Sequence, residues 1–305
     1  MRVLVTGATG YIGGRLVPRL YEQGYTVRCI ARASGRLLGR FPKDVEIVEG
    51  SIDDEEALRA ALTECEVAYY LVHSMGSTNK FAQADREAAR KFGAAAARAG
   101  ARLLIYLGGL GSDGEHLSTH LRSRHEVGAV LRESGVPVVE FRAAQIVGSG
   151  SISFEMIRYL TERLPVMVAP RWVETRCQPI GVRDVLAYLI GALSLPAKSE
   201  IYEIGGKTVL SYREMMLRYA ALRGLRRCIL VVPLFTPKLS SYWVHLITPI
   251  PARLAQPLIQ GLYNEVVVHN DRAARDFPAI DPLTYDEAVK LALDRSQSAD
   301  RESTW

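Results

Sequence analysis

The residues VTGATGYIG, Val5 to Gly13, form a glycine-rich turn between an apolar segment and a segment with helical periodicity. Gly7 permits a tight turn, Gly10 lets the backbone approach a diphosphate closely, and Gly13 lets the helix pack near the strand. The amino end of the helix offers free N–H groups and a partial positive charge. This turn therefore predicts a binding site for the diphosphate of a dinucleotide. The predicted contact residues are Gly7, Thr9, Gly10, Tyr11, Ile12 and Gly13.

Short apolar segments alternate with helical ones through the first half of the chain. Apolar strands separated by helices are typical of a parallel sheet that is covered on both faces. The pattern therefore predicts an α/β protein with a Rossmann doubly wound parallel sheet in residues 1–148. The predicted strands are residues 3–5, 26–31, 45–48, 67–73, 102–107 and 137–141, and the predicted helices are residues 13–23, 54–63, 81–99 and 119–134.

After residue 148 the alternation becomes less regular, which predicts a smaller substrate or partner domain in residues 149–305. Its strands could in part return to the Rossmann sheet. Ser211, with Glu214 three residues later, matches a capping box and predicts a helix that ends at Leu222. Further predictions are helices at 152–163 and 182–193 and a strand at 201–204, whereas residues 164–172 are apolar and interrupted by prolines.

The composition is that of an ordinary globular protein, with 48% hydrophobic residues and a net charge of +5 over 305 residues. The 38 basic residues are scattered among 33 acidic ones without a long basic block, which disfavours nucleic acid as a partner and allows a modest preference for anionic ligands. Four widely spaced cysteines lack metal-ligand spacing. They are expected to be buried side chains of a protein in the reducing cytoplasm. The first residues already predict a strand, which disfavours a signal peptide. The apolar run at 228–235 is too short to span a membrane, so that at most a peripheral membrane contact is expected.

The loop after the second predicted strand indicates which dinucleotide binds. An Asp or Glu there usually contacts the ribose 2′-hydroxyl of NAD, whereas an Arg accommodates the 2′-phosphate of NADP. Arg32, Ser34 and Arg36 offer cationic and hydroxyl donors, with no carboxylate among them to repel a phosphate. NADP(H) is therefore the predicted cofactor, and a solvated basic loop is the alternative. Further predicted contacts follow the third and fourth strands, at Ser51, Ile52, Leu71, Val72 and His73, of which His73 could equally be structural.

The sequence TGATGYIGG, at residues 6–14, resembles the short-chain dehydrogenase/reductase superfamily in its extended and atypical branches. Further segments resemble the atypical, NmrA-like NAD(P)H-binding proteins, often labelled nucleoside-diphosphate-sugar epimerase-like and akin to the 39-kDa accessory subunit of complex I. The resemblance covers most of the chain. The segments are YYLVHSMG (69–76), IYLGGLG (105–111), LSTHLRSRHEVG (117–128), FRAAQIVGSGSISFEMIRYLTERLPVM (141–167) and QPIGVRDV (178–185).

The resemblance implies a Ser after the fifth strand and a Tyr-x-x-x-Lys pair on the next helix, and both are missing here. His120-x-x-x-Arg124 stands in register with the missing pair. His120 could act as a general acid, since an unperturbed imidazole titrates near neutral pH. Arg124 could hold a ribose or a phosphate, and Tyr106 is a further candidate for the proton supply. The alternatives are a packing or capping role for His120 and a surface ion pair for Arg124.

The residues that follow the predicted nucleotide domain are apolar and aromatic, which favours a lipid-like carbonyl, quinone or isoprenoid substrate. A core between the two domains is the alternative interpretation. The leading hypothesis is an NADPH-dependent reductase of such an apolar substrate. A non-catalytic NADP(H)-binding redox sensor or assembly factor, with a regulatory protein partner, is the second, and a sugar-nucleotide epimerase is the third. The predicted wall consists of Phe154, Met156, Tyr159, Met167 and Trp172, with Arg142, Gln145 and Gln178 as polar candidates.

Overall fold

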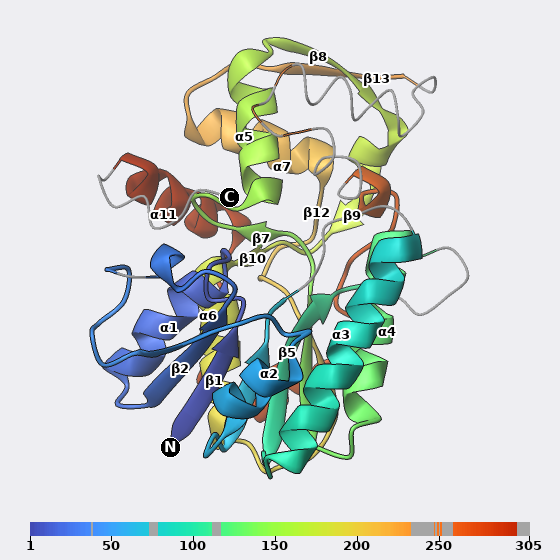
Figure 1. Ribbon diagram of the computed structural model, residues 1–305. Helices are drawn as coiled ribbons and strands as arrows, with labels where there is room; N and C mark the ends of the chain where they lie inside the picture. Colours follow the sequence, from blue (N-terminus) through green and yellow to red (C-terminus); the bar gives the residue numbers. More distant parts are fainter. Residues whose placement is uncertain are drawn as a thin grey trace.

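Seven parallel strands form the central sheet, in the order β11-β6-β5-β4-β1-β2-β3 (Figure 1). The order reverses beside β1 and β4, which makes the carboxyl ends of these two strands the switch point of a doubly wound fold. The predicted α/β Rossmann fold is confirmed in this computed structural model, which describes residues 1–37, 39–72, 79–111, 117–232, 247, 249, 251 and 259–297. The strands are β1 (Arg2–Thr6), β2 (Thr26–Ala31), β3 (Glu46–Glu49), β4 (Val67–Tyr70), β5 (Leu103–Gly109), β6 (Val138–Ala143) and β11 (Glu200–Ile204).

Alternate residues of each central strand enter two different hydrophobic cores, because successive side chains point to opposite faces of a sheet. Val3 and Val5 pack on one face, whereas Leu4 between them packs on the other, and all three are fully buried. This explains why the strands read as continuous apolar runs. The first face is covered by α1 (Gly13–Glu22) and α6 (Val182–Gly191), and the second by α2 (Glu55–Leu62), α3 (Asn79–Arg98) and α4 (Thr119–Arg132).

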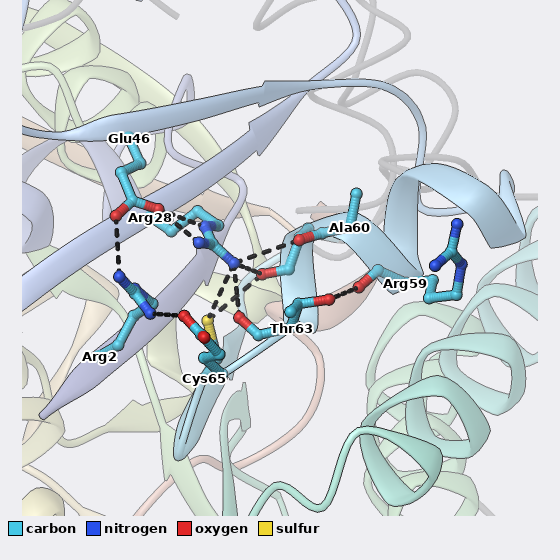
Figure 2. Close-up of polar contacts among 9 residues, drawn as sticks. Arg2, Arg28, Glu46, Arg59, Ala60, Thr63 and Cys65 are labelled. Atoms are coloured by element: carbon cyan, nitrogen blue, oxygen red, sulfur yellow. Dashed lines mark hydrogen bonds and ion pairs between the residues drawn. The ribbon is translucent and has the colours of Figure 1, made fainter.

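A polar network closes the amino-terminal end of the sheet, opposite the glycine-rich turn. Arg28 on β2 donates from Nη1 to the carbonyl oxygens of Ala60, Ala61 and Thr63, at 3.2, 3.2 and 2.7 Å (Figure 2). The same guanidinium pairs with Glu46 at 2.6 Å. A cation at these carbonyls compensates the negative end of the α2 dipole. The network therefore stabilises this end of the fold, and the opposite end remains for ligands.

A second lobe surrounds its own hydrophobic core and carries three two-stranded sheets (Figure 1). Two of the strand pairs are only two residues long, β7 with β10 and β9 with β12, and the third joins β8 to β13 over five residues. The elements of this lobe are β7 (Ile146–Val147), α5 (Ile152–Arg163), β8 (Val166–Pro170), η2 (Arg171–Glu174, a 3₁₀ helix), β9 (Arg176–Cys177), β10 (Ile180–Gly181), β12 (Leu210–Ser211), α7 (Tyr212–Leu222), β13 (Cys228–Val232) and α11 (Tyr285–Gln297). The remaining short elements lie in the Rossmann part and are α10 (Arg272–Asp276) and the 3₁₀ helices η1 (Ser34–Arg36) and η3 (Ala192–Ser194).

The capping box and the strand predicted after residue 148 are both present, and one further strand was not predicted. The capping box is confirmed, because the Ser211 hydroxyl accepts from the Glu214 N–H and the Glu214 carboxylate accepts from the Ser211 N–H. The strand expected at 201–204 is β11, which pairs in parallel with β6 and so joins the Rossmann sheet. The proline-interrupted stretch contains the strand β8, which the sequence did not predict. None of the described helices is long and apolar enough to cross a membrane.

Candidate cofactor site and active site

Two glycines of the phosphate turn, Gly7 and Gly13, stand where a side chain would collide with the backbone, and a third, Gly10, leaves little room for one. Gly7 has a φ of +69°, and a Cβ there would lie 2.5 Å from the Leu71 carbonyl oxygen. A Cβ on Gly13 would lie 2.3 Å from the carbonyl oxygen of Gly7, and one on Gly10 would lie 3.2 Å from the same atom. The Gly10 N–H donates to that oxygen at 2.9 Å. The turn is thus a cradle of bare backbone, which fits the diphosphate of a dinucleotide.

The turn lies at the switch point because Thr6 ties β1 to β4. The Thr6 hydroxyl donates to the Tyr69 carbonyl at 2.9 Å and accepts from the Leu71 N–H at 3.0 Å. Helix α1 follows with Ile12 as its N-cap, without a side-chain cap and without an acidic residue in its first turn. The positive end of α1 is therefore left to an anionic ligand. The predicted contacts Leu71 and Val72 are half-buried beside it, whereas His73 lies outside the described residues.

Tyr11 and Arg15 connect the phosphate turn to the second lobe. The Arg15 guanidinium lies 4.0 Å from the centre of the Tyr11 ring and donates to the Tyr11 carbonyl at 3.1 Å. Its Nη2 also donates to the Ser149 carbonyl at 2.8 Å. A Cβ on Gly148 would lie 2.3 Å from the Tyr11 hydroxyl oxygen. Sequence reasoning missed Arg15, because an arginine inside an amphipathic helix usually indicates a solvated face.

The loop after β2 differs from its prediction in one respect, because a carboxylate contacts it. The Ser34 hydroxyl and N–H both donate to the Glu49 carboxylate, the N–H at 3.3 Å. These hydrogen bonds lower the pKa of Glu49. Glu49 reaches the loop because it pairs in register with Ala31, at the ends of two adjacent parallel strands. Arg32 is exposed, and the side chain of Arg36 is outside the described part of the structure.

Arg40 is a second basic residue of this loop that sequence reasoning missed. Its Nη1 donates to the Thr9 carbonyl at 3.3 Å, and a Cβ on Gly14 would lie 2.2 Å from its Nη2. The guanidinium therefore lies over the first turn of α1, beside the phosphate cradle. Sequence reasoning missed this contact because Arg40 is far from the glycines along the chain. Ser51, a further predicted contact, forms a local turn in which its hydroxyl lies 3.3 Å from the Asp53 carboxylate, and Ile52 packs partly against the core.

Helix α4 is fixed to the carboxyl end of β5 by side chain-to-backbone hydrogen bonds. The Tyr106 hydroxyl donates to the Arg124 carbonyl at 3.0 Å, and Arg124 Nη2 donates to the Leu107 carbonyl at 2.7 Å. A ring nitrogen of His125, Nε2, lies 2.9 Å from the Gly109 carbonyl oxygen. Tyr106 is 2% exposed, and burial raises the pKa of its phenol far above the usual value. This geometry favours a structural role for Tyr106 over the predicted proton supply.

His120 lies in the first turn of α4, one helical turn before Arg124, and is half-buried. Burial, together with the positive charge of Arg124, lowers the pKa of His120 to about 4. The expectation that this imidazole titrates near neutral pH is therefore wrong, because the expectation assumed an exposed side chain. At pH 7 His120 is a neutral imidazole, which can donate one hydrogen bond or accept a proton. A protonated general acid is not available at this position near neutral pH.

The predicted apolar wall belongs largely to the core of the second lobe. Phe154 packs edge-on against Tyr219, and Trp172 packs edge-on against Tyr212. The interpretation of these residues as core is thus the one that the structure favours. Among the polar candidates, Gln178 bonds to the Gly206 carbonyl, Gln145 to the Ser153 carbonyl, and Arg142 to the buried Glu140. The buried predicted wall residues are Phe154, Met156, Met167 and Trp172, and Tyr159 is half-buried.

The sequence matches one family model and several curated proteins. A family model described as NAD(P)H-binding matches residues 7–150. The (4-alkanoyl-5-oxo-2,5-dihydrofuran-3-yl)methyl phosphate reductase of Streptomyces griseus is 31% identical over 232 residues, which are 73% of this chain and 74% of that protein. A putative dihydroflavonol 4-reductase of Synechocystis is 26% identical over 278 residues, which are 79% of this chain and 77% of that protein.

Solved structures share the fold over nearly the whole chain. The NADPH-dependent quinone oxidoreductase QOR2 of Escherichia coli, complexed with NADPH, has a TM-score of 0.75 at 17% identity, over 94% of this chain and 98% of that one. The UDP-glucose 4-epimerase of Thermotoga maritima has a TM-score of 0.73 at 16% identity, over 97% of this chain and 99% of that one. At such identities the likeness extends to the fold, and it leaves the reaction open.

Proposed function

Since this chain belongs to the NAD(P)H-binding family, we propose that it is an NADPH-dependent reductase of an apolar, conjugated carbonyl compound. The observation that carries the proposal is the cradle of Gly7, Gly10 and Gly13, in which every added side chain would meet backbone. The reductases among its relatives support the reaction type, and the free amino end of α1 supports the diphosphate site.

The choice of NADPH rests on the two arginines beside the phosphate turn. Arg32 follows β2 directly, and Arg40 lies over the carbonyl of Thr9. Guanidinium groups suit a 2′-phosphate, because they donate several hydrogen bonds in a fixed geometry. Glu49 opposes this choice, since its carboxylate would repel the same phosphate unless Ser34 and Glu49 separate when the cofactor binds. Such a reductase would use the cytoplasmic NADPH pool. Three of its cysteines are buried free thiols, which agrees with a reducing compartment.

The proposed chemistry follows from what α4 offers in place of Tyr-x-x-x-Lys. The cofactor, when bound, supplies a hydride to the substrate. In a conjugated acceptor the resulting negative charge is delocalised onto the carbonyl oxygen, which requires a donor more than a strong acid. Neutral His120 would donate a hydrogen bond to that oxygen, and the Arg124 cation, one turn along the helix, would stabilise the charge. The final proton would come from water. An isolated ketone would be a poor substrate, because its alkoxide needs a proton as it forms.

The experiment is NADPH oxidation, followed at 340 nm, with quinones, enones and saturated aldehydes of matched size, after NADPH binding has been measured by calorimetry. We expect turnover with the conjugated acceptors and little with the saturated ones. His120→Leu should lower kcat, and His120→Asn, which keeps an N–H donor, should restore part of it. Binding of NADPH without oxidation by any acceptor would refute the reductase.

A second function is suggested by Tyr106 on β5, because its hydroxyl already donates a structural hydrogen bond to the Arg124 carbonyl. A cofactor-binding protein without a proton donor could act as a redox sensor or assembly factor that binds a regulatory protein partner. A pull-down with and without NADPH tests this function, since a ligand shifts an equilibrium only by its differential affinity. Equal capture of partners in both conditions would remove this alternative.

A further inference from the structure

The strands β8 and β13 form an isolated parallel ribbon at the periphery of the second lobe, above α5 and α7 in Figure 1. Its inner face is part of the lobe's core, where Met167 is 1% exposed and Ile229 is 6% exposed. Its outer face carries Val166, Val168 and Leu230, which are 58%, 42% and 52% exposed. Because alternate residues share a face, these side chains form one patch, and we name residues 166–170 and 228–232 the apolar ribbon.

This patch is unusual within the part of the chain that the structure describes. Eight large hydrophobic side chains are exposed there, and four of the eight lie on the apolar ribbon. The register aligns Val168 with Leu230 and Val166 with Cys228, so that the exposed side chains of the outer face are neighbours across the two strands. Val231, the fourth, aligns with the buried Ala169 and belongs to the opposite face. Contiguous exposed apolar surface indicates an interaction site more often than scattered single residues do.

The charge around the apolar ribbon indicates what kind of surface it meets. Residues 152–176 and 211–232 contain nine of the chain's 38 basic residues and four of its 33 acidic ones, so that the remainder of the chain is formally neutral. The net charge of +5 is therefore concentrated in the segments that carry the ribbon and its supporting helices. Exposed arginines stand at both ends of the ribbon, with Arg163 and Arg226 before the strands and Arg171 after β8.

The acidic side chains of the same segments have partners other than the arginines at the ends of the ribbon. Glu155 pairs with Arg158, and the exposed Glu174 pairs with Arg213. Glu162 accepts from the Tyr219 hydroxyl at 2.5 Å and lies 3.5 and 3.6 Å from Arg158 and Arg223. Glu214 closes the capping box of α7. Within the described part of the chain, no ion pair joins Arg163, Arg171 or Arg226 to a carboxylate. The patch is therefore apolar at its centre and cationic at its margins.

We propose that the apolar ribbon docks this protein on the surface of an anionic lipid bilayer. Apolar side chains that enter the interface, together with arginines that attract anionic headgroups, are the two components by which peripheral proteins bind membranes. A nucleic acid would match the charge and leave the valines and the leucine exposed. The proposal is independent of the reductase activity, because it concerns a face that contains none of the cofactor or catalytic residues.

The test is flotation of the purified protein with vesicles of phosphatidylcholine alone and with vesicles that contain phosphatidylglycerol. We expect flotation with the anionic vesicles, weakened by salt. Arg171→Gln with Arg226→Gln should weaken binding by roughly fivefold for each charge, and Val168→Asn with Leu230→Asn should abolish it. The controls are Arg98→Gln and Leu291→Asn, which remove an exposed arginine and an exposed leucine elsewhere. Thermal unfolding and NADPH affinity should be unchanged in all these variants.

Cys228 provides a second readout on the same face, because it is the exposed cysteine among four that all lie in the described residues. An environment-sensitive fluorophore attached there should shift to the blue on addition of anionic vesicles. Absence of flotation by the unlabelled protein would overturn the proposal, as would flotation that the ribbon variants leave intact. Concentration-dependent dimerisation that Val168→Asn with Leu230→Asn abolishes, without vesicle binding, would also overturn it and assign the ribbon to a second copy of the chain.

Discussion

Tyr106 and Arg124 fix strand β5 and helix α4 to each other by two reciprocal hydrogen bonds. The Tyr106 hydroxyl on β5 donates to the Arg124 carbonyl on α4 at 3.0 Å, and the Arg124 guanidinium donates back to the Leu107 carbonyl, next to Tyr106, at 2.7 Å. The pair fixes the depth at which α4 lies on the sheet, and with it the position of His120, one turn earlier on the same helix. Both residues therefore serve first to position the helix that carries the candidate active site.

Tyr106→Phe separates this positioning role from proton supply. We expect the variant to lose about 1 kcal/mol of unfolding free energy, the usual worth of one hydrogen bond. Its single-turnover rate of NADPH oxidation should stay within about threefold of wild type, because loss of a general acid costs roughly 10²–10⁴-fold. A rate loss of that larger size, with an intact fold by circular dichroism, would show that Tyr106 supplies the proton.

Gly13→Ala tests the phosphate cradle against a neighbouring substitution. A methyl group at Gly13 would lie 2.3 Å from backbone oxygen, whereas one at Gly14 would lie 2.2 Å from the movable guanidinium of Arg40 and 3.3 Å from the Ala8 carbonyl oxygen. We expect Gly13→Ala to cost about 1–3 kcal/mol of stability and to weaken NADPH binding by about tenfold or more. Gly14→Ala should change stability little. Calorimetric titration and thermal unfolding measure both, and a Gly13→Ala variant that binds NADPH as wild type does would contradict the assignment of the cradle.

Glu49→Gln tests which dinucleotide the loop prefers. Removal of the carboxylate beside Ser34 should tighten NADPH binding and leave NADH binding nearly constant, because only NADPH brings a phosphate to this place. Arg32→Ala should do the opposite and weaken NADPH by about tenfold or more, the worth of a charge-assisted hydrogen bond. The two cofactors are compared by calorimetry in each variant. An Arg32→Ala protein that binds NADPH as wild type does would transfer the role to Arg40.

The sequence predicts those features that depend on neighbouring residues and misses those that depend on strand register. The glycine turn and the capping box of Ser211 are local patterns, and both are where they were expected. The contact of Glu49 with Ser34 follows from the pairing of β2 with β3, which no local pattern encodes. The apolar ribbon joins segments about sixty residues apart without a connecting turn, and therefore leaves no signature in either segment.

The lowered pKa of His120 also depends on tertiary contacts that no local pattern encodes. Sequence position identifies the residue and its place on the helix, whereas its pKa depends on how deeply the helix packs and on the charge of Arg124. The same limit applies to Glu140. The sequence gives no sign that this carboxylate lies buried under α4 between Arg132 and Arg142, which approach from a helix and from its own strand.

Glu140→Gln should therefore be strongly destabilising. The Glu140 side chain is completely buried and pairs with two arginines, so its neutralisation removes a counter-charge from the buried Arg142 and the half-buried Arg132. Such a loss costs about 3–5 kcal/mol. Asp281→Asn is the matched control, because Asp281 is 80% exposed and pairs with Lys207 at 2.7 Å on the surface; a pair of that kind contributes at most about 1 kcal/mol. Urea unfolding compares the two, and similar losses would show that the buried triad contributes little net stability.

His120 gives a pH dependence whose sign follows from its lowered pKa. In the unfolded chain an imidazole titrates at about 6.5, and in the folded protein the pKa of His120 is about 4. Between these values the unfolded state binds more protons, so the contribution of His120 to stability is complete above the unfolded pKa and is lost as the pH falls toward 4. One proton of difference changes the unfolding free energy by about 1.4 kcal/mol per pH unit.

His120→Gln should remove this slope, and His269→Gln, at an exposed position, controls for the loss of an imidazole. Urea unfolding from pH 4 to 7 measures the slopes. If wild type and His120→Gln fall in parallel below pH 6, His120 is not a neutral buried imidazole, and its proposed role as a neutral donor fails with it.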